Sequence, residues 1–134
     1  MELISYLCSM EKWKDIQEFS GDYQVSNLGN VRSVDRMKYC GNNSYQLKKG
    51  VDKKIQTQKS GHNYVNLYKD NKNYTRRIHR LVATEFIDNP NKYPCVMHKD
   101  DNPNNNVVKN LSWGTLKMNT KDMMTKNRNR NQYI

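Results

Sequence analysis

The sequence predicts an α+β fold, in which a β-rich N-terminal module and a hairpin precede a unit of two strands and a helix. Three observations support this prediction. Apolar and polar residues alternate over residues 23–34 and 63–79, as they do in half-buried strands. Apolar residues then follow a helical spacing over residues 78–87. Two short apolar runs, 93–98 and 111–114, flank a loop rich in Asn and Asp.

The N-terminal elements occupy residues 11–36. Residues 23–25 alternate as a strand, residues 26–30 offer turn chemistry, and the alternation resumes over 31–34. Residues 37–60 are polar and rich in Lys, with Gly and Asn at several positions, so we expect a linker or flexible segment there. Residues 11–60 are therefore expected to form a β-rich module with a basic linker.

The second half begins with a hairpin, whose strands 64–68 and 74–78 flank a five-residue polar connection. The helix over 78–87 has its apolar face on Ile78, Leu81, Val82 and Phe86, and it stops before Pro90. A strand over 93–98, a strand over 111–114 and a helix over 116–126 follow, with Thr115 as its N-cap. We expect one domain over 61–126 and a basic tail over 127–134.

The chain carries a formal charge of +10, while apolar residues make up only 35% of it. Because so few residues are apolar, the hydrophobic core must be thin, which suits a protein that lies against a larger partner. Lys and Arg dominate residues 36–80, where Asp52 and Asp70 are the only acidic residues. Such a segment attracts a polyanion by releasing its counterions. Nucleic acid is the first candidate, and an acidic membrane surface is a weaker one because no amphipathic basic helix or anchor is visible.

The cysteines argue for a reducing compartment. Cys8, Cys40 and Cys95 are odd in number, far apart and in no C-x-x-C pair, which predicts neither a disulfide framework nor a Cys-based zinc site. The apolar start of the chain is short and lacks the basic residues of a signal peptide. We therefore expect a soluble, cytoplasmic protein.

Three polar side chains stand out for chemistry. His98 ends a predicted strand beside a polar loop, where a neutral imidazole can take a proton from water near pH 7, or can simply be a packed or surface residue. Asn119 shares a predicted inward helix face with Leu116 and Met123, so its amide needs a partner: either a hard cation or the facing hairpin. Asn110 precedes the second strand and can bind backbone groups across the loop.

Two motifs carry a resemblance to a known family. Residues 79–119 contain H-K-D-x-N-x-x-N-N-x-x-x-N-L-x-W, followed by Asn six residues after the Trp. This run resembles the HNH endonucleases encoded in phage genomes and their introns. Residues 13–34, with W-K-x-I and Y-x-V-S-N-x-G-x-V-R-S, resemble the nuclease-associated modular motif that accompanies them. Together the two motifs cover over half the chain in the expected order.

The resemblance implies a ββα-metal (HNH) centre that cleaves DNA. His98 would be the general base that activates water, Asn110 the loop-positioning Asn, and Asn119 a ligand to one divalent cation, Mg²⁺ or Mn²⁺. Members of the family often have an Asp ligand before the histidine, whereas this chain has Met97. A thioether is a poor ligand for a hard cation. Either an Asp substitutes, or DNA phosphate and water complete the shell, or cleavage is lost; the candidate substitutes are Asp100, Asp101 and Asp122.

The charge pattern predicts the DNA contacts, with solvated surface as the alternative for many of the lysines. Hairpin strands fit a major groove, and an extended basic segment can track the backbone or the minor groove. The candidates are Arg32, Arg36, Lys48, Lys49, Lys53, Lys54, Arg76, Arg77 and Arg80.

Three functions stay open. The first is a homing-type nicking endonuclease, in the host cytoplasm if a phage encodes it. The second is a catalytically weakened DNA-binding protein on the same scaffold, and the third is an RNA-binding protein or ribonuclease. We expect double-stranded DNA as the partner, no membrane, and a monomer or weak homodimer.

Overall fold

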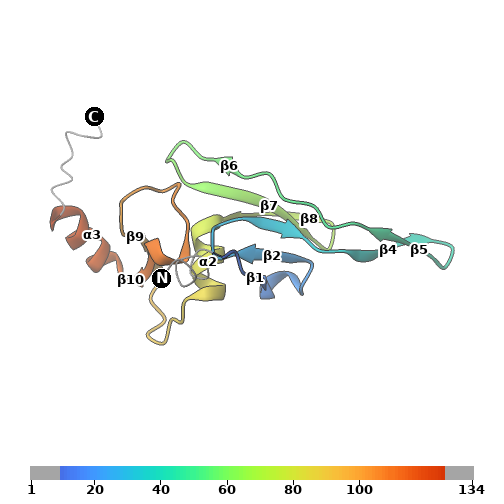
Figure 1. Ribbon diagram of the computed structural model, residues 1–134, viewed down its shortest axis with the longest axis horizontal. Helices are drawn as coiled ribbons and strands as arrows, with labels where there is room; N and C mark the ends of the chain where they lie inside the picture. Colours follow the sequence, from blue (N-terminus) through green and yellow to red (C-terminus); the bar gives the residue numbers. More distant parts are fainter. Residues whose placement is uncertain (1–9, 126–134) are drawn as a thin grey trace.

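The N-terminal module is a three-stranded antiparallel sheet. The computed structural model describes residues 10–125, with side chains as far as residue 120. Strands β1 (Trp13–Asp15), β2 (Tyr23–Ser26) and β3 (Val31–Ser33) pair in that order, and the 3-10 helix η1 (Gln17–Phe19) connects β1 to β2. The Ser26 hydroxyl accepts hydrogen bonds from the backbone of Leu28 and Asn30, which fixes the turn between β2 and β3. The strands predicted here are therefore confirmed (Figure 1).

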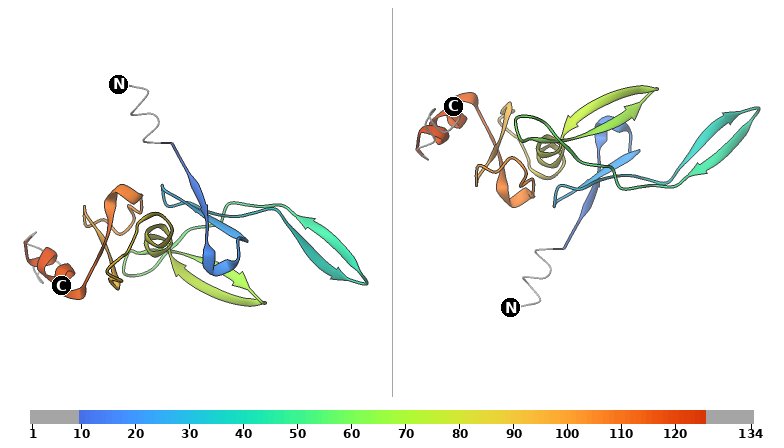
Figure 2. Two further views of the ribbon diagram at one scale, coloured as in Figure 1. Left: turned by 90° about the horizontal axis from the view of Figure 1, so that it is seen from below. Right: turned by 90° about the horizontal axis from the view of Figure 1, so that it is seen from above.

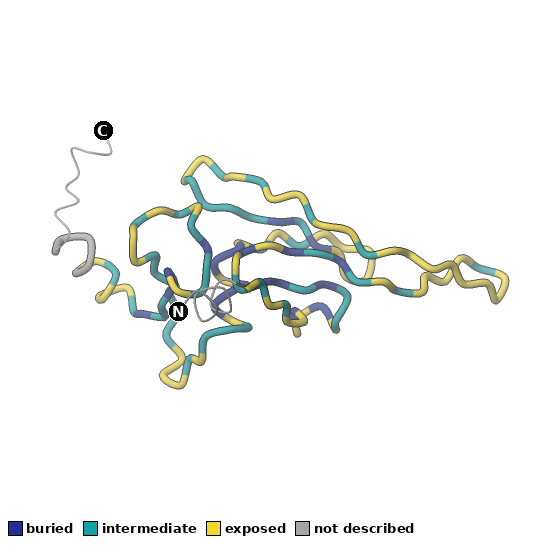
Figure 3. The backbone as a smooth tube through the Cα atoms, in the orientation of Figure 1, coloured by how far each residue is buried: buried dark blue, intermediate teal, exposed yellow. Residues whose placement is uncertain are grey.

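The expected linker is instead largely structured. Residues 37–60 contain most of a second hairpin, formed by β4 (Arg36–Gly41) and β5 (Ser44–Lys48), and the short strand β6 (Gln56–Thr57). This hairpin projects from one end of the molecule (Figures 1 and 2). It is exposed along most of its length (Figure 3). Its turn residues Gly41, Asn42 and Asn43 all have positive φ, which suits Gly and Asn.

The next sheet contains the predicted central hairpin. Strand β6 pairs with β7 (Asn63–Lys69), which pairs with β8 (Lys72–Arg77). The connection was expected to have five residues, but it is the two-residue turn Asp70–Asn71, with φ of 52° and 63°. Positive φ at both positions matches the twist of the flanking strands. The helix α2 (Ile78–Phe86) follows directly, as predicted.

The C-terminal elements also follow the predicted order. Strand β9 (Cys95–His98) pairs antiparallel with β10 (Leu111–Gly114), and the 3-10 helix η2 (Val108–Asn110) lies in the connection. The helix α3 (Leu116–Thr125) ends the described chain. The Thr115 hydroxyl accepts a 3.1 Å hydrogen bond from the backbone NH of Met118, so Thr115 caps α3 as expected. None of the described helices is long and apolar enough to cross a membrane.

One hydrophobic core joins the two halves of the chain. Val25 and Val31 of the N-terminal sheet pack in the same cluster as Leu67 of β7, Val82 of α2 and Leu111 of β10. The Tyr23 hydroxyl also accepts a hydrogen bond from the backbone NH of Tyr68. The core is thus continuous across residue 60, where the sequence suggested a boundary, and the dark-blue segments of Figure 3 lie in the body of the molecule, not in the projecting hairpin.

Candidate catalytic centre

His98 lies at the end of β9, directly over the core. Its backbone partner in the ladder is Leu111 at the start of β10, and Leu111 is 3% exposed. The backbone NH of Lys99 donates to Asn110 O at 2.8 Å, which continues the pairing into the loop. The buried end of this hairpin therefore holds the half-exposed imidazole where the polar loop begins.

The loop between β9 and β10 is built around the Asp100 carboxylate. It accepts hydrogen bonds from the side chain of Asn105 at 2.7 Å, from the backbone NH of Asn102 at 2.8 Å and from the side chain of Asn110 at 2.9 Å. These bonds, the Asn105 bond foremost, lower the pKa of Asp100 to about 2. Asp100 is therefore charged at neutral pH, and its two oxygens are engaged within the loop.

Asn110 closes the same loop, as its place in the motif suggested. Its side-chain oxygen accepts from the backbone NH of Asp100 at 3.0 Å, and its amide nitrogen also donates to Asn105 O at 2.8 Å. Asn110 is 7% exposed, so these bonds satisfy a buried amide. The residue shapes the loop that follows His98 and has no hydrogen bond to the imidazole among the described contacts.

The residue that does bond to His98 is Asn106, which the sequence argument did not single out. His98 Nε2 lies 2.8 Å from Asn106 Oδ1, and Asn106 is 4% exposed. The only available signal was its place in the N-N pair of the motif. Because Asn is frequent in this chain, spacing alone could not separate Asn106 from its neighbours.

Two further histidines surround His98. The ring centroids of His79, on α2, and of His62, in the loop before β7, lie 5.0 and 6.1 Å from that of His98. Burial is the main cause that lowers the pKa of His79 to about 3, and electrostatic repulsion from the neighbouring His98, His62, Arg77 and Arg80 adds to it. Burial also lowers the pKa of His62. His79 is therefore neutral and packs behind the site. No feature of the sequence indicated that His62 lies beside it.

The described residues offer few hard ligands for a divalent cation. No group of three His, Cys, Asp or Glu side chains among them could hold a metal ion. Met97 packs against Gly114, since a Cβ built there would lie 2.6 Å from the Met97 sulfur. The Asp100 oxygens are already hydrogen-bonded, and the side chain of Asp122 lies outside the described residues. The amide of Asn119 is the one predicted metal ligand whose side chain makes no hydrogen bond in the described part.

The predicted inward face of the last helix is partly wrong. Leu116 is 70% exposed, and Asn119 is half-buried. The reason is the position of α3, which lies at the end of the molecule opposite the β4–β5 hairpin and is not surrounded by other described elements (Figure 1). Met123, the third residue of that face, has its side chain outside the described residues.

Three of the predicted DNA-binding arginines are engaged within the protein. The Arg32 guanidinium lies 4.0 Å over the Trp13 ring. The Arg76 guanidinium forms a bidentate ion pair with the Glu18 carboxylate, which connects β8 to η1. Arg80 donates to Pro94 O at 2.8 Å and lies over the Trp113 ring. These contacts hold elements together, which the charge pattern alone could not reveal.

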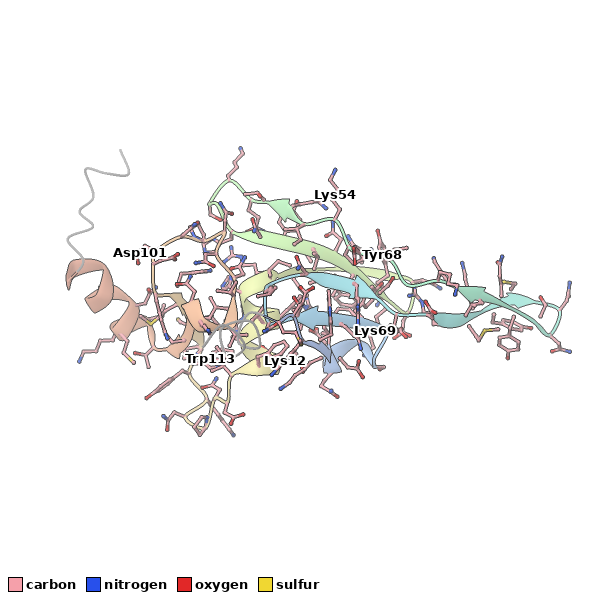
Figure 4. All side chains as sticks on the ribbon, viewed as in Figure 1. Lys12, Lys54, Tyr68, Lys69, Asp101 and Trp113 are labelled. Carbon is pink, nitrogen blue, oxygen red and sulfur yellow. The ribbon has the colours of Figure 1, made fainter. Side chains whose placement is uncertain are left out.

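The remaining candidates differ in exposure. Lys48 and Lys54 are exposed, and Lys54 points away from the body in Figure 4. Lys49 is exposed and lies 3.8 Å from Asp35. The other three are Arg36 and Lys53, which lie near the Tyr23 ring, and Arg77, which donates to Gln58.

Comparison with known proteins supports the resemblance. Residues 11–68 match the NUMOD4 motif. The chain is 37% identical over 115 residues to DNA endonuclease I-HmuI of Bacillus phage SP01, an alignment that covers 86% of this chain and 59% of that protein. It is 39% identical over 114 residues to the uncharacterized HNH endonuclease L245 of Acanthamoeba polyphaga mimivirus, covering 85% of this chain and 30% of the relative.

A solved structure shows the same fold. The structure described as DNA binding and cleavage by the HNH homing endonuclease I-HmuI superposes with a TM-score of 0.70 at 35% identity. The match covers 87% of this chain and 59% of that one, so this chain spans less than two thirds of the length of its relative. With its NUMOD4 motif and its likeness in both sequence and fold, the chain is homologous to I-HmuI and similar to other HNH endonucleases.

Proposed function

We propose that this chain is a metal-dependent DNA endonuclease that hydrolyses phosphodiester bonds with His98 as the general base. The observation that carries the proposal is the His98 imidazole, which ends β9 with one ring nitrogen held by Asn106. A base must be oriented and must have one free nitrogen to accept a proton from water. The neighbouring Asp100–Asn110 network supports this orientation by stiffening the loop that follows.

The reaction is a hydrolysis. Water attacks phosphorus while its proton passes to His98, and the bond from phosphorus to the 3′-oxygen breaks. The 3′-oxygen takes a proton from solvent water, and the products are a 5′-phosphate and a 3′-hydroxyl. A bound Mg²⁺ or Mn²⁺ would stabilise the charge on the leaving oxygen and on the transition state. Asn119 would hold the ion through its side-chain oxygen, with water and DNA phosphate as further ligands. Asp122 is a second candidate ligand, and Asp100 a weaker one because its oxygens are engaged.

The β4–β5 hairpin is the proposed main DNA contact. By its register, Arg36 pairs with Lys48 and Lys38 with Gln46, so these residues share one face of the ribbon. A two-stranded ribbon fits the major groove of B-DNA, and Lys or Arg side chains beside it can reach phosphates. Lys49, Lys53, Lys54 and Arg77 would extend this contact along the body.

The test is the nicking of supercoiled plasmid by wild type and by His98→Ala, with Mg²⁺, with Mn²⁺ and with chelator. The proposal expects metal-dependent cleavage that falls by at least a hundredfold in His98→Ala, because proton transfer by a positioned base contributes about 10²–10⁴-fold. Salt-sensitive DNA binding should be unchanged in the variant. Cleavage that survives His98→Ala or chelation would contradict the mechanism.

A second function remains a candidate because of Met97. Its sulfur packs against Gly114 at the position where related enzymes often place a carboxylate, so the ion site is short of hard ligands. In that case the chain would bind DNA through the same surface and cleave it weakly or not at all. Intact salt-dependent binding with no cleavage of any duplex would favour this function, and cleavage of RNA in preference to DNA would favour a ribonuclease.

A further inference from the structure

The turn between β2 and β3 touches the loop that carries the catalytic candidate residues. The backbone NH of Val108 donates to Asn27 O at 2.9 Å. Gly29 has a φ of +89°, and a Cβ built on it would lie 3.1 Å from Asn106 Cβ and 3.2 Å from Asn106 O. Because a side chain at this position would press on Asn106, the Gly29 backbone forms one wall of the Asn106 site.

The Asn106 side chain in turn makes a single described hydrogen bond, in which its oxygen accepts from His98. Its Oδ1 lies 2.8 Å from His98 Nε2, and the residue is 4% exposed. A carbonyl oxygen only accepts hydrogen bonds, so Nε2 must carry the ring proton of the neutral imidazole. The lone pair is then on Nδ1. In metal and catalytic sites the bond made by one ring nitrogen fixes which nitrogen is free to react.

We propose that the N-terminal module completes the catalytic centre by holding Asn106 against His98, which fixes the Nε2–H tautomer and leaves Nδ1 as the base. This inference rests on the proposed function for its catalytic meaning. Asn106 is a positioning residue that acts through His98, and the turn at residues 27–29 is its support. The module would therefore do more than contact DNA, since it also sets the orientation of the imidazole.

The inference can be tested without any cleavage by nitrogen NMR of ¹⁵N-histidine-labelled full chain at pH 8. Protonated and unprotonated ring nitrogens have distinct shifts, so the spectrum reports the tautomer directly. Wild type should show His98 as a single Nε2–H form. Asn106→Leu, which removes the acceptor, should show a mixture of the two forms. A wild-type Nδ1–H form, or an unchanged spectrum in Asn106→Leu, would overturn the inference.

Matched variants separate this role from simple loss of folding. Asn106→Asp keeps an acceptor oxygen and should retain the Nε2–H form, whereas Asn104→Leu alters an exposed neighbour on the same loop and should leave the spectrum unchanged. Gly29→Ala and Gly21→Ala introduce the same strain at a positive φ, of +89° and +83°. Only Gly29 lies against Asn106, so only Gly29→Ala should mix the tautomers. Equal effects of the two glycine variants would overturn the role of the turn.

Single-turnover cleavage by the same proteins distinguishes this inference from the proposed function. If wild type cleaves, Asn106→Leu and Gly29→Ala should cleave at least tenfold more slowly, with DNA binding retained. Wild-type rates in both variants would overturn the catalytic part of the inference while leaving the nuclease function in place. If wild type does not cleave but the tautomers shift as expected, the positioning by Asn106 is supported and the nuclease function fails.

Discussion

At the scale of single residues, the neighbours of His98 differ sharply in their capacity to bind a divalent cation. Asp100 has the right charge for a metal ligand, yet its oxygens bind Asn102, Asn105 and Asn110. Met97 immediately precedes His98 but presents a soft sulfur to Gly114. In the proposed mechanism the metal-ligand role therefore falls to Asn119 and to groups outside the described residues, so we expect the site to bind a divalent cation weakly.

A carboxylate at position 97 should strengthen metal-dependent cleavage. Met97→Asp replaces a soft thioether with a hard oxygen ligand one residue before His98, and it should lower the Mg²⁺ concentration for half-maximal cleavage by on the order of tenfold, or about 1.4 kcal/mol. Cleavage rates across a Mg²⁺ series measure this shift. Met97→Leu is the control, because it keeps the apolar packing against Gly114 without any ligand. An equal shift in both variants would show that packing, not ligation, is responsible.

The site could be predicted from sequence only as far as residue identity and spacing carry information. His98 and Asn110 follow from their motif positions, and the structure places both at the β9–β10 loop. Asn106 did not follow, because its role depends on which of several adjacent asparagines turns inward toward His98. The contact with Gly29 determines which asparagine turns inward, and Gly29 lies 77 positions before Asn106 in the chain.

At the scale of elements, the β4–β5 hairpin was missed because its composition is that of a loop. Its strands lie almost wholly in solvent, so no buried face imposes a clear hydrophobic pattern. A signal was nevertheless present: Met37 faces Leu47 and Tyr39 faces Tyr45 across a Gly–Asn–Asn turn. By contrast, α2 was predictable because the core demands its apolar spacing.

The basic face of this hairpin should contribute to DNA affinity through phosphate contacts. Replacing both Lys38 and Lys48 with Ala should weaken binding of any duplex and reduce the slope of log Kd against log salt by about 2, since each phosphate contact contributes about 0.9. Fluorescence anisotropy over a salt series measures the slope. Lys92→Ala, an exposed residue of the α2–β9 loop, should leave it unchanged. An unaltered slope in the double variant would remove the hairpin from the DNA contact.

Buried His79 should make the fold sensitive to acid. Burial lowers its pKa from 6.5 to about 3. Below pH 6.5 the unfolded chain therefore binds a proton at this histidine, whereas the folded chain does not. The stability is therefore full above pH 6.5 and falls as the pH drops toward 3. From pH 7 to pH 5 this group should cost about 2 kcal/mol of unfolding free energy. Urea unfolding at both pH values should show this loss in wild type and not in His79→Phe; an equal loss in the variant would assign it to other groups.

At the scale of the whole molecule, the protein is elongated, and one shared core connects its two halves. The β4–β5 hairpin and α3 lie at opposite ends, with the β9–β10 site toward the α3 end (Figure 1). The core joins the N-terminal sheet to β7, α2 and β10, so the part of the molecule between the two ends is one packed body. The sequence indicated two modules because composition changes near residue 60. It could not show that their apolar faces pack together, since that packing depends on contacts distant along the chain.

This asymmetry predicts the pattern of cleavage. The described chain contains a single β9–β10 centre and a single projecting hairpin, so under the proposed function one bound molecule would place His98 against one strand only. Supercoiled plasmid should become open circles long before linear DNA accumulates, and the nicking rate should rise in proportion to protein concentration. End-labelling should place the nicks preferentially on one strand of a preferred site. Gel time courses over a protein concentration series measure both features, with sedimentation to establish the oligomeric state. Linear DNA appearing without an open-circle intermediate, at a rate that rises with the square of concentration, would instead mean that two copies act together with their centres on opposite strands.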